Sequence, residues 1–405
     1  MFKKLGFFKN DLIKNILIVF SGNAIGLLIP FLGAFWIARL YKPEDLGYFS
    51  FIIVVINIIV LVSDLKLGER LIIEAKQEEK VKIFNESVLI IVITTILTFP
   101  FLVLYFYEKL GLYTLLLPLL VIVSSFSNLL INYSISIKDF KVNSKFKVLM
   151  NAFDFTFQVF FYKLKLLGLL ISKFLSSLVA LIYLFKSLKI KHKMELNFSF
   201  ETLKKNKKYV LSYVPNIFVN HLSQNVINFS FPLSYGVTQL GLYSFMVRII
   251  FGPISVITSS LQQVFYKELA DKINKNEQVQ SFFIKFYTTV ILLMFIPVLL
   301  ICIYSKEIIL YLFGETWVEA HMYIIALAPF FILNSCNSSF SSIYVVKNKI
   351  KTMMKLECFY LVSKIVIIFG LYWLGFNITF MVNSLGILLF ITSILTASFY
   401  YRISN

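Results

Sequence analysis

The side chains best suited to binding a polar ligand form a stripe on one strongly apolar segment near the middle of the chain. Within residues 209–232 amides recur at steps of four, as Asn216, Asn220, Gln224 and Asn228. This spacing places them on one face of a helix, where amides both donate and accept hydrogen bonds. Hydrogen bonding between helices is the alternative use of the same side chains. Two shorter stripes repeat the pattern, Ser124, Asn128 and Asn132, and Asn334, Asn337 and Ser341.

Isolated cations inside apolar segments are the second group of candidates. Arg248 lies near the middle of one such segment, where a charge costs about 2.5–3.5 kcal/mol on insertion scales, so we expect it to face a polar interior. A guanidinium is well suited to a phosphate, although a buried ion pair would also explain Arg248. Lys364 and Lys173 are similarly placed, with the alternative that their long stems reach toward a membrane surface.

Three further residues could form ion pairs or carry protons. Asp154 is the only carboxylate that we place well inside an apolar segment. We expect it to pair with a cation, with proton uptake as the alternative. His221 stands beside the amide stripe, where a neutral, hydrogen-bonded imidazole is favoured over a proton carrier. Arg39 lies close to Lys42 and Glu44, which favours a headgroup or loop contact over a gating ion pair.

Little in the chain suggests covalent chemistry. It has three histidines and three cysteines, and Cys302, Cys336 and Cys358 lack the spacing of a metal site or redox pair. Few groups could therefore act as a catalytic base. We predict a protein that is not an enzyme and that uses no metal and no cofactor.

Membrane-spanning helices must position these residues. Hydrophobic residues make up 59% of the 405 residues and the mean hydropathy is +0.82, well above the range of soluble domains. At about 20 residues a crossing, the chain has room for about twelve crossings joined by short loops. Helices are predicted near residues 15–40, 44–65, 84–107, 112–137, 147–163, 166–186, 209–232, 236–265, 281–304, 318–344, 356–373 and 378–400.

The distribution of positive charge supports this count. The formal net charge of +18 does not form one basic face, which argues against a nucleic-acid partner. Lysine and arginine instead concentrate in every second connection between predicted helices. We therefore expect an even number of helices, both termini in the cytoplasm and a location in the inner (cytoplasmic) membrane. The basic loops require no partner beyond membrane lipids.

An internal repeat predicts two halves. LGYFSF at residues 46–51 recurs as LGLYSF at residues 240–245, and a long basic connection lies near the middle of the chain. We predict an N-terminal six-helix bundle over residues 1–187, a cytoplasmic linker over 188–208 and a C-terminal six-helix bundle over 209–405. Because each half has an even number of helices, the halves would share one orientation and enclose a central cavity.

The helix pattern and its local motifs resemble a known family. The motifs are PEDLGYF at residues 43–49, LGE at residues 67–69 and VTQLGLYSF at residues 237–245. They are similar to the polysaccharide (Wzx-type O-antigen) flippases of the multidrug/oligosaccharidyl-lipid/polysaccharide exporter superfamily. The resemblance implies an all-α polytopic protein with about twelve transmembrane helices in two pseudo-symmetric six-helix bundles around a central cavity. It also implies alternating access, with transfer of an undecaprenyl-pyrophosphate-linked O-antigen or capsule repeat unit to the outer leaflet.

This resemblance gives the candidate residues their roles. A hydrated sugar and an anionic diphosphate do not cross hydrocarbon unaided, so the protein must supply a polar, cationic interior. The amide stripe would bind sugar hydroxyls, and Arg248, Lys364 and Lys173 would be candidates for binding the diphosphate. The lipid-linked oligosaccharide is the main expected partner, with a glycan polymerase and chain-length proteins as further candidates. Coupling to a cation gradient is compatible with the superfamily, but no residue identifies an ion.

Two other functions remain open. One is a different exporter of the same superfamily, for a drug or a lipid precursor, although peptidoglycan-precursor flippases usually carry two additional helices. The other is a membrane-embedded glycan polymerase or transferase. Such enzymes usually place catalytic residues in a long extracytoplasmic loop or pair acids at a membrane surface. Every predicted non-cytoplasmic loop is short, which favours a transporter.

Overall fold

The computed structural model describes residues 28–74, 76–188, 200–250, 280–340 and 350–403, together with residues 26 and 254. Within these ranges every regular element is an α-helix or a 3-10 helix, so the predicted all-α fold is confirmed. Each of the twelve predicted segments is represented there by a helix. Parts of the first and eighth predicted helices, most of the 188–208 linker and Ser341 lie outside the described residues.

The chain forms two compact units. Unit 1 comprises Met1–Gly33 and Ile52–Phe218, and unit 2 comprises Ala34–Phe51 and Val219–Asn405. All three boundaries fall inside helices, so the units are joined by continuous helical segments at these points. The division into bundles at residues 187 and 209 stays a prediction.

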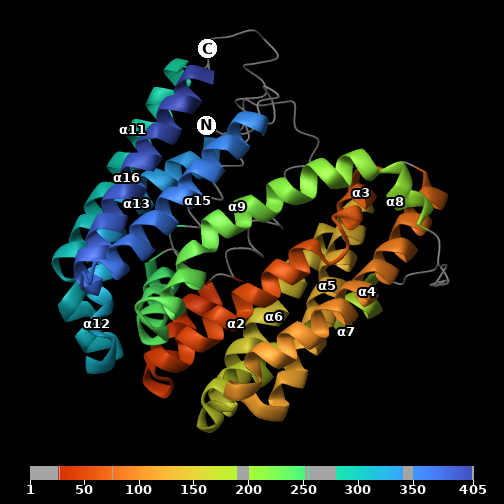
Figure 1. Ribbon diagram of the computed structural model, residues 1–405, viewed down its shortest axis with the longest axis horizontal. Helices are drawn as coiled ribbons and strands as arrows, with labels where there is room; N and C mark the ends of the chain where they lie inside the picture. Colours follow the sequence, from red (N-terminus) through yellow and green to blue (C-terminus); the bar gives the residue numbers. More distant parts are fainter. Residues whose placement is uncertain are drawn as a thin grey trace, which may run out of the picture. The chain divides into compact units, whose positions relative to one another are not determined.

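Unit 1 is built from the helices between the middle of α2 (Pro43–Val62) and the start of α9 (Lys207–Leu233). Between them lie α3 (Leu67–Ile73), α4 (Gln77–Leu110), α5 (Leu116–Ser136), α6 (Phe140–Phe160), α7 (Leu166–Leu188) and α8 (Glu201–Lys205). α7 packs against both α5 and α6. Figure 1 shows α4 to α7 side by side, in orange to yellow-green. Their shared core includes Ile91, Leu130 and Leu184.

Unit 2 contains the rest of α9 and the later helices. These are Val237–Ile250, α11 (Gln280–Ile303), α12 (Ser305–Phe313), α13 (Ala320–Phe340), α15 (Ile350–Trp373) and α16 (Ile378–Ile403). α16 packs against both α13 and α15, and α11 packs against α13. The part of the helix Leu28–Leu40 from Ala34 onward also belongs to this unit, where the Trp317 indole Nε1 donates a 2.7 Å hydrogen bond to the Ala38 carbonyl oxygen.

The two copies of the LG repeat pack against each other within unit 2. A Cβ atom at Gly47 would lie 1.9 Å from the Val237 carbonyl oxygen, and one at Gly241 would lie 1.8 Å from the Pro43 carbonyl oxygen. Each glycine thus contacts the backbone four residues before the other glycine. Small residues allow such close approach of two membrane helices. This reciprocal contact explains why both copies of the repeat have a glycine at the same position.

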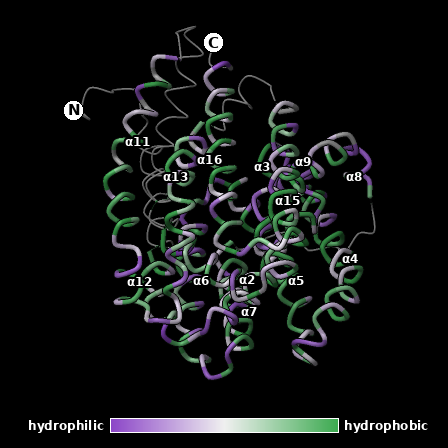
Figure 2. The backbone as a smooth tube through the Cα atoms, turned by 60° about the vertical axis from the view of Figure 1, so that its left-hand side comes forward, coloured by the Kyte–Doolittle hydropathy of each residue, from purple (hydrophilic) through white to green (hydrophobic). Residues whose placement is uncertain are grey.

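The surface of the helices identifies a multi-pass membrane protein. Six stretches of the described residues are long and apolar enough to cross a membrane, and one of them, Gln77–Ser136, holds both α4 and α5. Leu104, Leu292 and Trp373 are each more than 70% exposed, which a lipid environment explains and water does not. Figure 2 shows long hydrophobic stretches along α4 and α16, whereas α8 is hydrophilic.

Three short helices, α3, α8 and α12, are not among the predicted helices. They have 7, 5 and 9 residues, too few to register in a search for segments of about 20 apolar residues. α4 also begins at Gln77, seven residues before the predicted start at 84, because its first two turns are polar. Hydropathy detects the part of a helix that lies in hydrocarbon and not its polar extension.

Candidate functional site

A polar cavity of about 210 Å³ lies in unit 1, where α2 ends and α3 and α5 meet. Its lining residues are Val60, Ser63, Asp64, Lys66, Glu69, Ser125, Asn128, Ile131 and Asn132. Asn128 and Asn132 belong to the shorter stripe predicted for residues 112–137. Its third member, Ser124, is not part of the lining, and the neighbouring Ser125 takes that place.

A strained turn after α2 builds one wall of this cavity. Leu65 and Lys66 both have positive φ, 50° and 61°, which costs free energy for residues with a Cβ atom. The Asp64 carboxylate stabilises the turn by accepting 2.9 Å hydrogen bonds from the backbone N–H groups of Lys66 and Gly68. A Cβ at Gly68 would lie 2.4 Å from the same carboxylate, so this position requires glycine.

The charges of the turn are paired within unit 1. The Lys66 ammonium lies 2.9 Å from one Glu69 oxygen, and the Tyr213 hydroxyl donates a 3.0 Å hydrogen bond to the other. Asp64 is almost fully buried, and this burial raises the pKa of its carboxyl above the ordinary value despite the backbone donors and Lys66. The geometry of the turn thus depends on side chains that extend from α3 to the start of α9.

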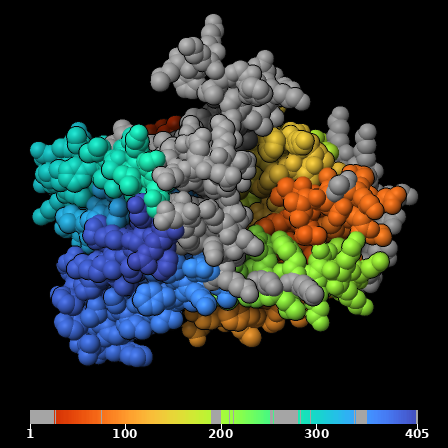
Figure 3. Space-filling view, turned by 90° about the horizontal axis from the view of Figure 1, so that it is seen from above, coloured from red at the N-terminus to blue at the C-terminus, as the bar shows by residue number. Residues whose placement is uncertain are grey.

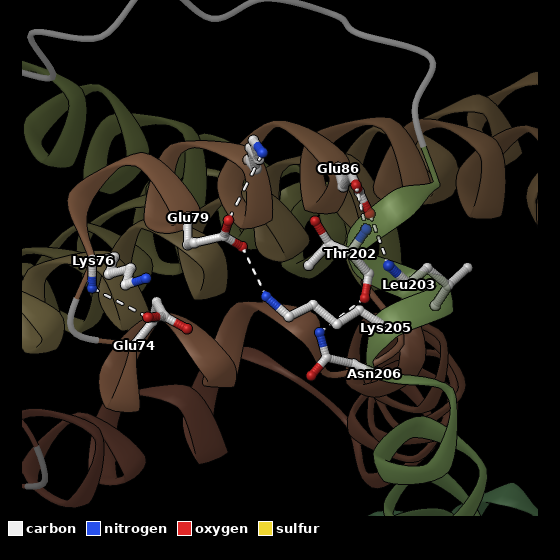
Figure 4. Close-up of polar contacts among 9 residues, drawn as sticks. Glu74, Lys76, Glu79, Glu86, Thr202, Leu203, Lys205 and Asn206 are labelled. Atoms are coloured by element: carbon white, nitrogen blue, oxygen red, sulfur yellow. Dashed lines mark hydrogen bonds and ion pairs between the residues drawn. The ribbon is translucent and has the colours of Figure 1, made fainter.

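A buried glutamate fixes the segment that follows the linker. Glu86 in α4 is 3% exposed, and its two oxygens accept hydrogen bonds of 2.7 and 3.0 Å from the backbone N–H groups of Thr202 and Leu203. Figure 4 shows this contact beside the more exposed pair of Lys205 and Glu79, whose N–O distance is 3.3 Å. Figure 3 shows α8 and the start of α9, in green, packed beside the orange atoms of α3 and α4.

We predict that Glu86→Ala loosens this segment. Hydrogen bonds to a charged group contribute about 1.5–3 kcal/mol each, and the two amides would lose their acceptor. Amide hydrogen exchange at Thr202 and Leu203 should therefore become at least tenfold faster. This factor corresponds to a loss of about 1.4 kcal/mol or more in the free energy of local opening. Glu79→Ala is the control, because its ion pairs with Lys82 and Lys205 are more exposed and weak. Equal exchange in both variants would contradict the anchoring role.

Two predicted candidates meet inside unit 1. The Lys173 ammonium in α7 lies 4.0 Å from one oxygen of the Asp154 carboxylate in α6. The other oxygen, Oδ1, is buried and has no hydrogen-bond partner among the described residues. The pair is loose, and it leaves one carboxylate oxygen available to a further donor.

The Lys364 ammonium interacts with Ser223 and Glu357 in unit 2. It donates a 2.8 Å hydrogen bond to the Ser223 carbonyl oxygen in α9. Glu357, seven residues earlier in α15, interacts with the Lys364 charge and accepts a hydrogen bond from the Ser223 side chain. The ammonium therefore has partners inside the helix bundle of unit 2.

The amide stripe of α9 is partly bonded to itself. In unit 2 the Gln224 side chain donates a 2.8 Å hydrogen bond to the Asn220 oxygen, and Asn228 donates one of 3.1 Å to the Asn225 oxygen. Gln224 is exposed, and Asn220 and Asn228 are partly buried. Asn216, the first member of the stripe, lies on the part of α9 that belongs to unit 1 and is also partly buried.

The remaining predicted residues occupy separate positions in unit 2. Arg248 is partly buried in the helix Val237–Ile250, and His221 is partly buried in α9, where its carbonyl oxygen accepts a hydrogen bond from the Asn225 side chain. Arg39 is exposed near the end of the helix 28–40. Asn337 forms the interhelical type of contact, since it accepts from the Tyr287 hydroxyl and donates to the Ser393 carbonyl oxygen.

Sequence analysis missed several acidic residues. Two further carboxylates besides Asp154 lie on long helices, since Glu86 is buried in α4 and Glu357 is half-buried in α15. Glu357 could have been found, since a spacing of seven residues places it on the same helix face as Lys364. The turn residues gave no such signal, because Asp64 lies at the very end of the predicted segment 44–65 and Glu69 lies outside the predicted segments. Among the described residues, no three potential metal ligands come together.

Several known proteins are similar to this chain. A family model described as a polysaccharide biosynthesis protein matches residues 36–322. The lipid II flippase MurJ, in an inward closed conformation, has a TM-score of 0.70 at 18% identity, with 97% of this chain and 90% of that chain covered. An inward-facing multidrug resistance MATE transporter of the MOP superfamily has a TM-score of 0.67 at 16% identity, with 96% and 98% covered. No match was found among curated proteins.

A MOP superfamily transporter from Pyrococcus furiosus is similar over the same extent. Its TM-score is 0.66 at 16% identity, and 96% of each chain is covered. Likeness at these identities establishes the fold, which is the twelve-helix fold of this superfamily. The family model covers more than half of the chain, so it shows the family. The chain belongs to the polysaccharide biosynthesis protein family.

Proposed function

We propose that this protein is a flippase that moves an undecaprenyl-pyrophosphate-linked oligosaccharide from the cytoplasmic to the outer leaflet of the inner membrane. The observation that carries the proposal is the match to the polysaccharide biosynthesis family over residues 36–322. The fold supports it, because MurJ and the MATE proteins are described as a lipid II flippase and as transporters. Both termini are then cytoplasmic, in agreement with the charge distribution.

Polar side chains on the helices offer the hydrogen bonds and the positive charges that such a substrate requires. Sugar hydroxyls donate and accept hydrogen bonds, as do the α9 amides at Asn220, Gln224 and Asn228. An anionic diphosphate needs cations, for which Arg248 and Lys364 are the candidates. Ordinary thermal motion of the lipid cannot bring these hydrophilic groups across hydrocarbon, because burying unpaired polar groups costs several kilocalories per mole. Alternating access would replace that cost with contacts to the protein.

Complementation of a strain that lacks its own O-antigen flippase tests this proposal. Wild-type protein should restore surface glycan with at least one matched glycan donor, whereas Arg248→Ala should lower the restored glycan about tenfold or more if the guanidinium contacts the diphosphate. Membrane levels of both proteins must be equal. Failure of the well-expressed wild-type protein with several matched donors would overturn the proposed function. Normal export by Arg248→Ala would remove only the diphosphate role of Arg248.

A further inference from the structure

The cavity of unit 1 presents an unusual set of hydrogen-bonding groups. Ser125 lines it and is 1% exposed, yet its hydroxyl has no hydrogen-bond partner among the described residues. Buried hydroxyls are normally bonded, so such a group indicates a missing ligand or water. The amides of Asn128 and Asn132 lie on the same lining, and each offers both donors and acceptors.

The charges of the cavity argue against a phosphate. Asp64 and Glu69 carry two negative charges, and Lys66 carries one positive charge that is already paired with Glu69. A diphosphate placed here would meet a net negative lining. Its charged, non-bridging oxygens would also find no cation free of a competing carboxylate among the lining residues.

The same carboxylates do not form a coordination site for a single cation. Asp64 accepts backbone hydrogen bonds at both oxygens, and the two Glu69 oxygens are bonded to Lys66 and Tyr213. A hard cation needs several oxygens that converge at short distance. A volume of about 210 Å³ also exceeds the space of one dehydrated ion. A neutral ligand with many hydroxyl groups fits better.

One wall of the cavity is apolar, which suits the C–H face of a sugar ring. Val60 and Ile131 lie in the lining together with the amides and Ser125. A pyranose has an apolar face and a rim of hydroxyls, and ligand sites commonly combine apolar walls with a few placed polar groups.

We propose that this cavity binds one neutral sugar unit of the transported glycan, through Ser125, Asn128 and Asn132. The assignment of the sugar to the transported glycan rests on the proposed function, whereas sugar binding itself does not. Lys66 begins a basic connection that the charge distribution places in the cytoplasm. The cavity is therefore a subsite for the glycan before it crosses the membrane.

Saturation-transfer NMR on the full-length protein in nanodiscs tests the site with free glucose, galactose and N-acetylglucosamine, each at millimolar concentration. Wild-type protein should transfer saturation to at least one of these sugars. Ser125→Ala should weaken binding of that sugar about fivefold, the expected loss for one hydrogen bond. Thermal stability of Ser125→Ala should be unchanged or higher, because the variant removes an unbonded buried hydroxyl.

Ser127→Ala is the matched control on the same helix. Ser127 is also buried, but its hydroxyl donates a 2.8 Å hydrogen bond to the Val123 carbonyl oxygen and it does not line the cavity. This variant should bind the sugar like the wild type. Asn128→Ala, at an exposed position, gives a second variant with little risk to folding.

The outcomes separate this site from the proposed function. Absence of transfer to any of the three sugars, or equal binding by Ser125→Ala, would overturn the sugar site even if the wild type restores surface glycan in complementation. A Ser125-dependent thermal shift with sodium ions or inorganic phosphate, without sugar binding, would also overturn it. Sugar binding by a protein that fails complementation would retain the site and reject the proposed transport.

Discussion

Replacing Gly241 by alanine is expected to prevent stable folding of unit 2. The added Cβ would lie 1.8 Å from the Pro43 carbonyl oxygen and 2.6 Å from its carbon, so backbone and not a flexible side chain would have to move. Overpacking of this kind costs about 3 kcal/mol or more when the neighbour cannot rotate away. Size-exclusion chromatography of a fluorescent fusion in detergent should show loss of the monodisperse peak and a lower unfolding temperature.

A second glycine provides the control for this prediction. A Cβ at Gly370, inside α15 of the same unit, would meet no atom within 4 Å. Gly370→Ala should therefore keep or raise stability, by about 0.5–1 kcal/mol, through the helix preference for alanine. Gly47→Ala should resemble Gly241→Ala, because the contact is reciprocal. Similar unfolding temperatures for Gly241→Ala and Gly370→Ala would contradict the close approach of the two helices.

Replacing Lys364 by methionine is expected to reduce both stability and export. The variant leaves the Glu357 carboxylate inside the bundle, with Ser223 as its remaining hydrogen-bond partner among the residues that the structure describes. Both side chains are partly buried, so leaving the Glu357 charge without its neighbouring cation should cost about 1–3 kcal/mol. The unfolding temperature in nanodiscs should fall, and the level of surface glycan in complementation should fall with it.

A double variant separates the structural role of Lys364 from substrate binding. Lys364→Met combined with Glu357→Leu removes both charges, and replacing a buried pair by apolar residues is often close to neutral for stability. The double variant should therefore fold nearly as well as the wild type. If Lys364 binds the diphosphate, export should still be lost. Normal export by this stable double variant would show that Lys364 serves only the fold.

The sequence by itself determined that the protein lies in a membrane, and it located the twelve long apolar helical segments. Runs of about 20 apolar residues must lie in hydrocarbon as helices, because each backbone polar group has to be bonded within its own segment. The alternation of lysine-rich connections predicted the orientation of the chain in the membrane, because lysine and arginine concentrate in cytoplasmic loops. The LG repeat was also visible in the sequence, but its meaning was not.

Only the tertiary structure decided which polar groups meet. Asp154 and Lys173 lie on different helices, as do Ser223 and Lys364, so no spacing along the chain could pair them. The cavity that contains Ser125 depends on a turn with positive φ at Leu65 and Lys66, which hydropathy does not report. Hydropathy registers the partition of a segment between water and lipid, whereas a site depends on the rotation of each helix about its axis. Packing against neighbouring helices sets that rotation.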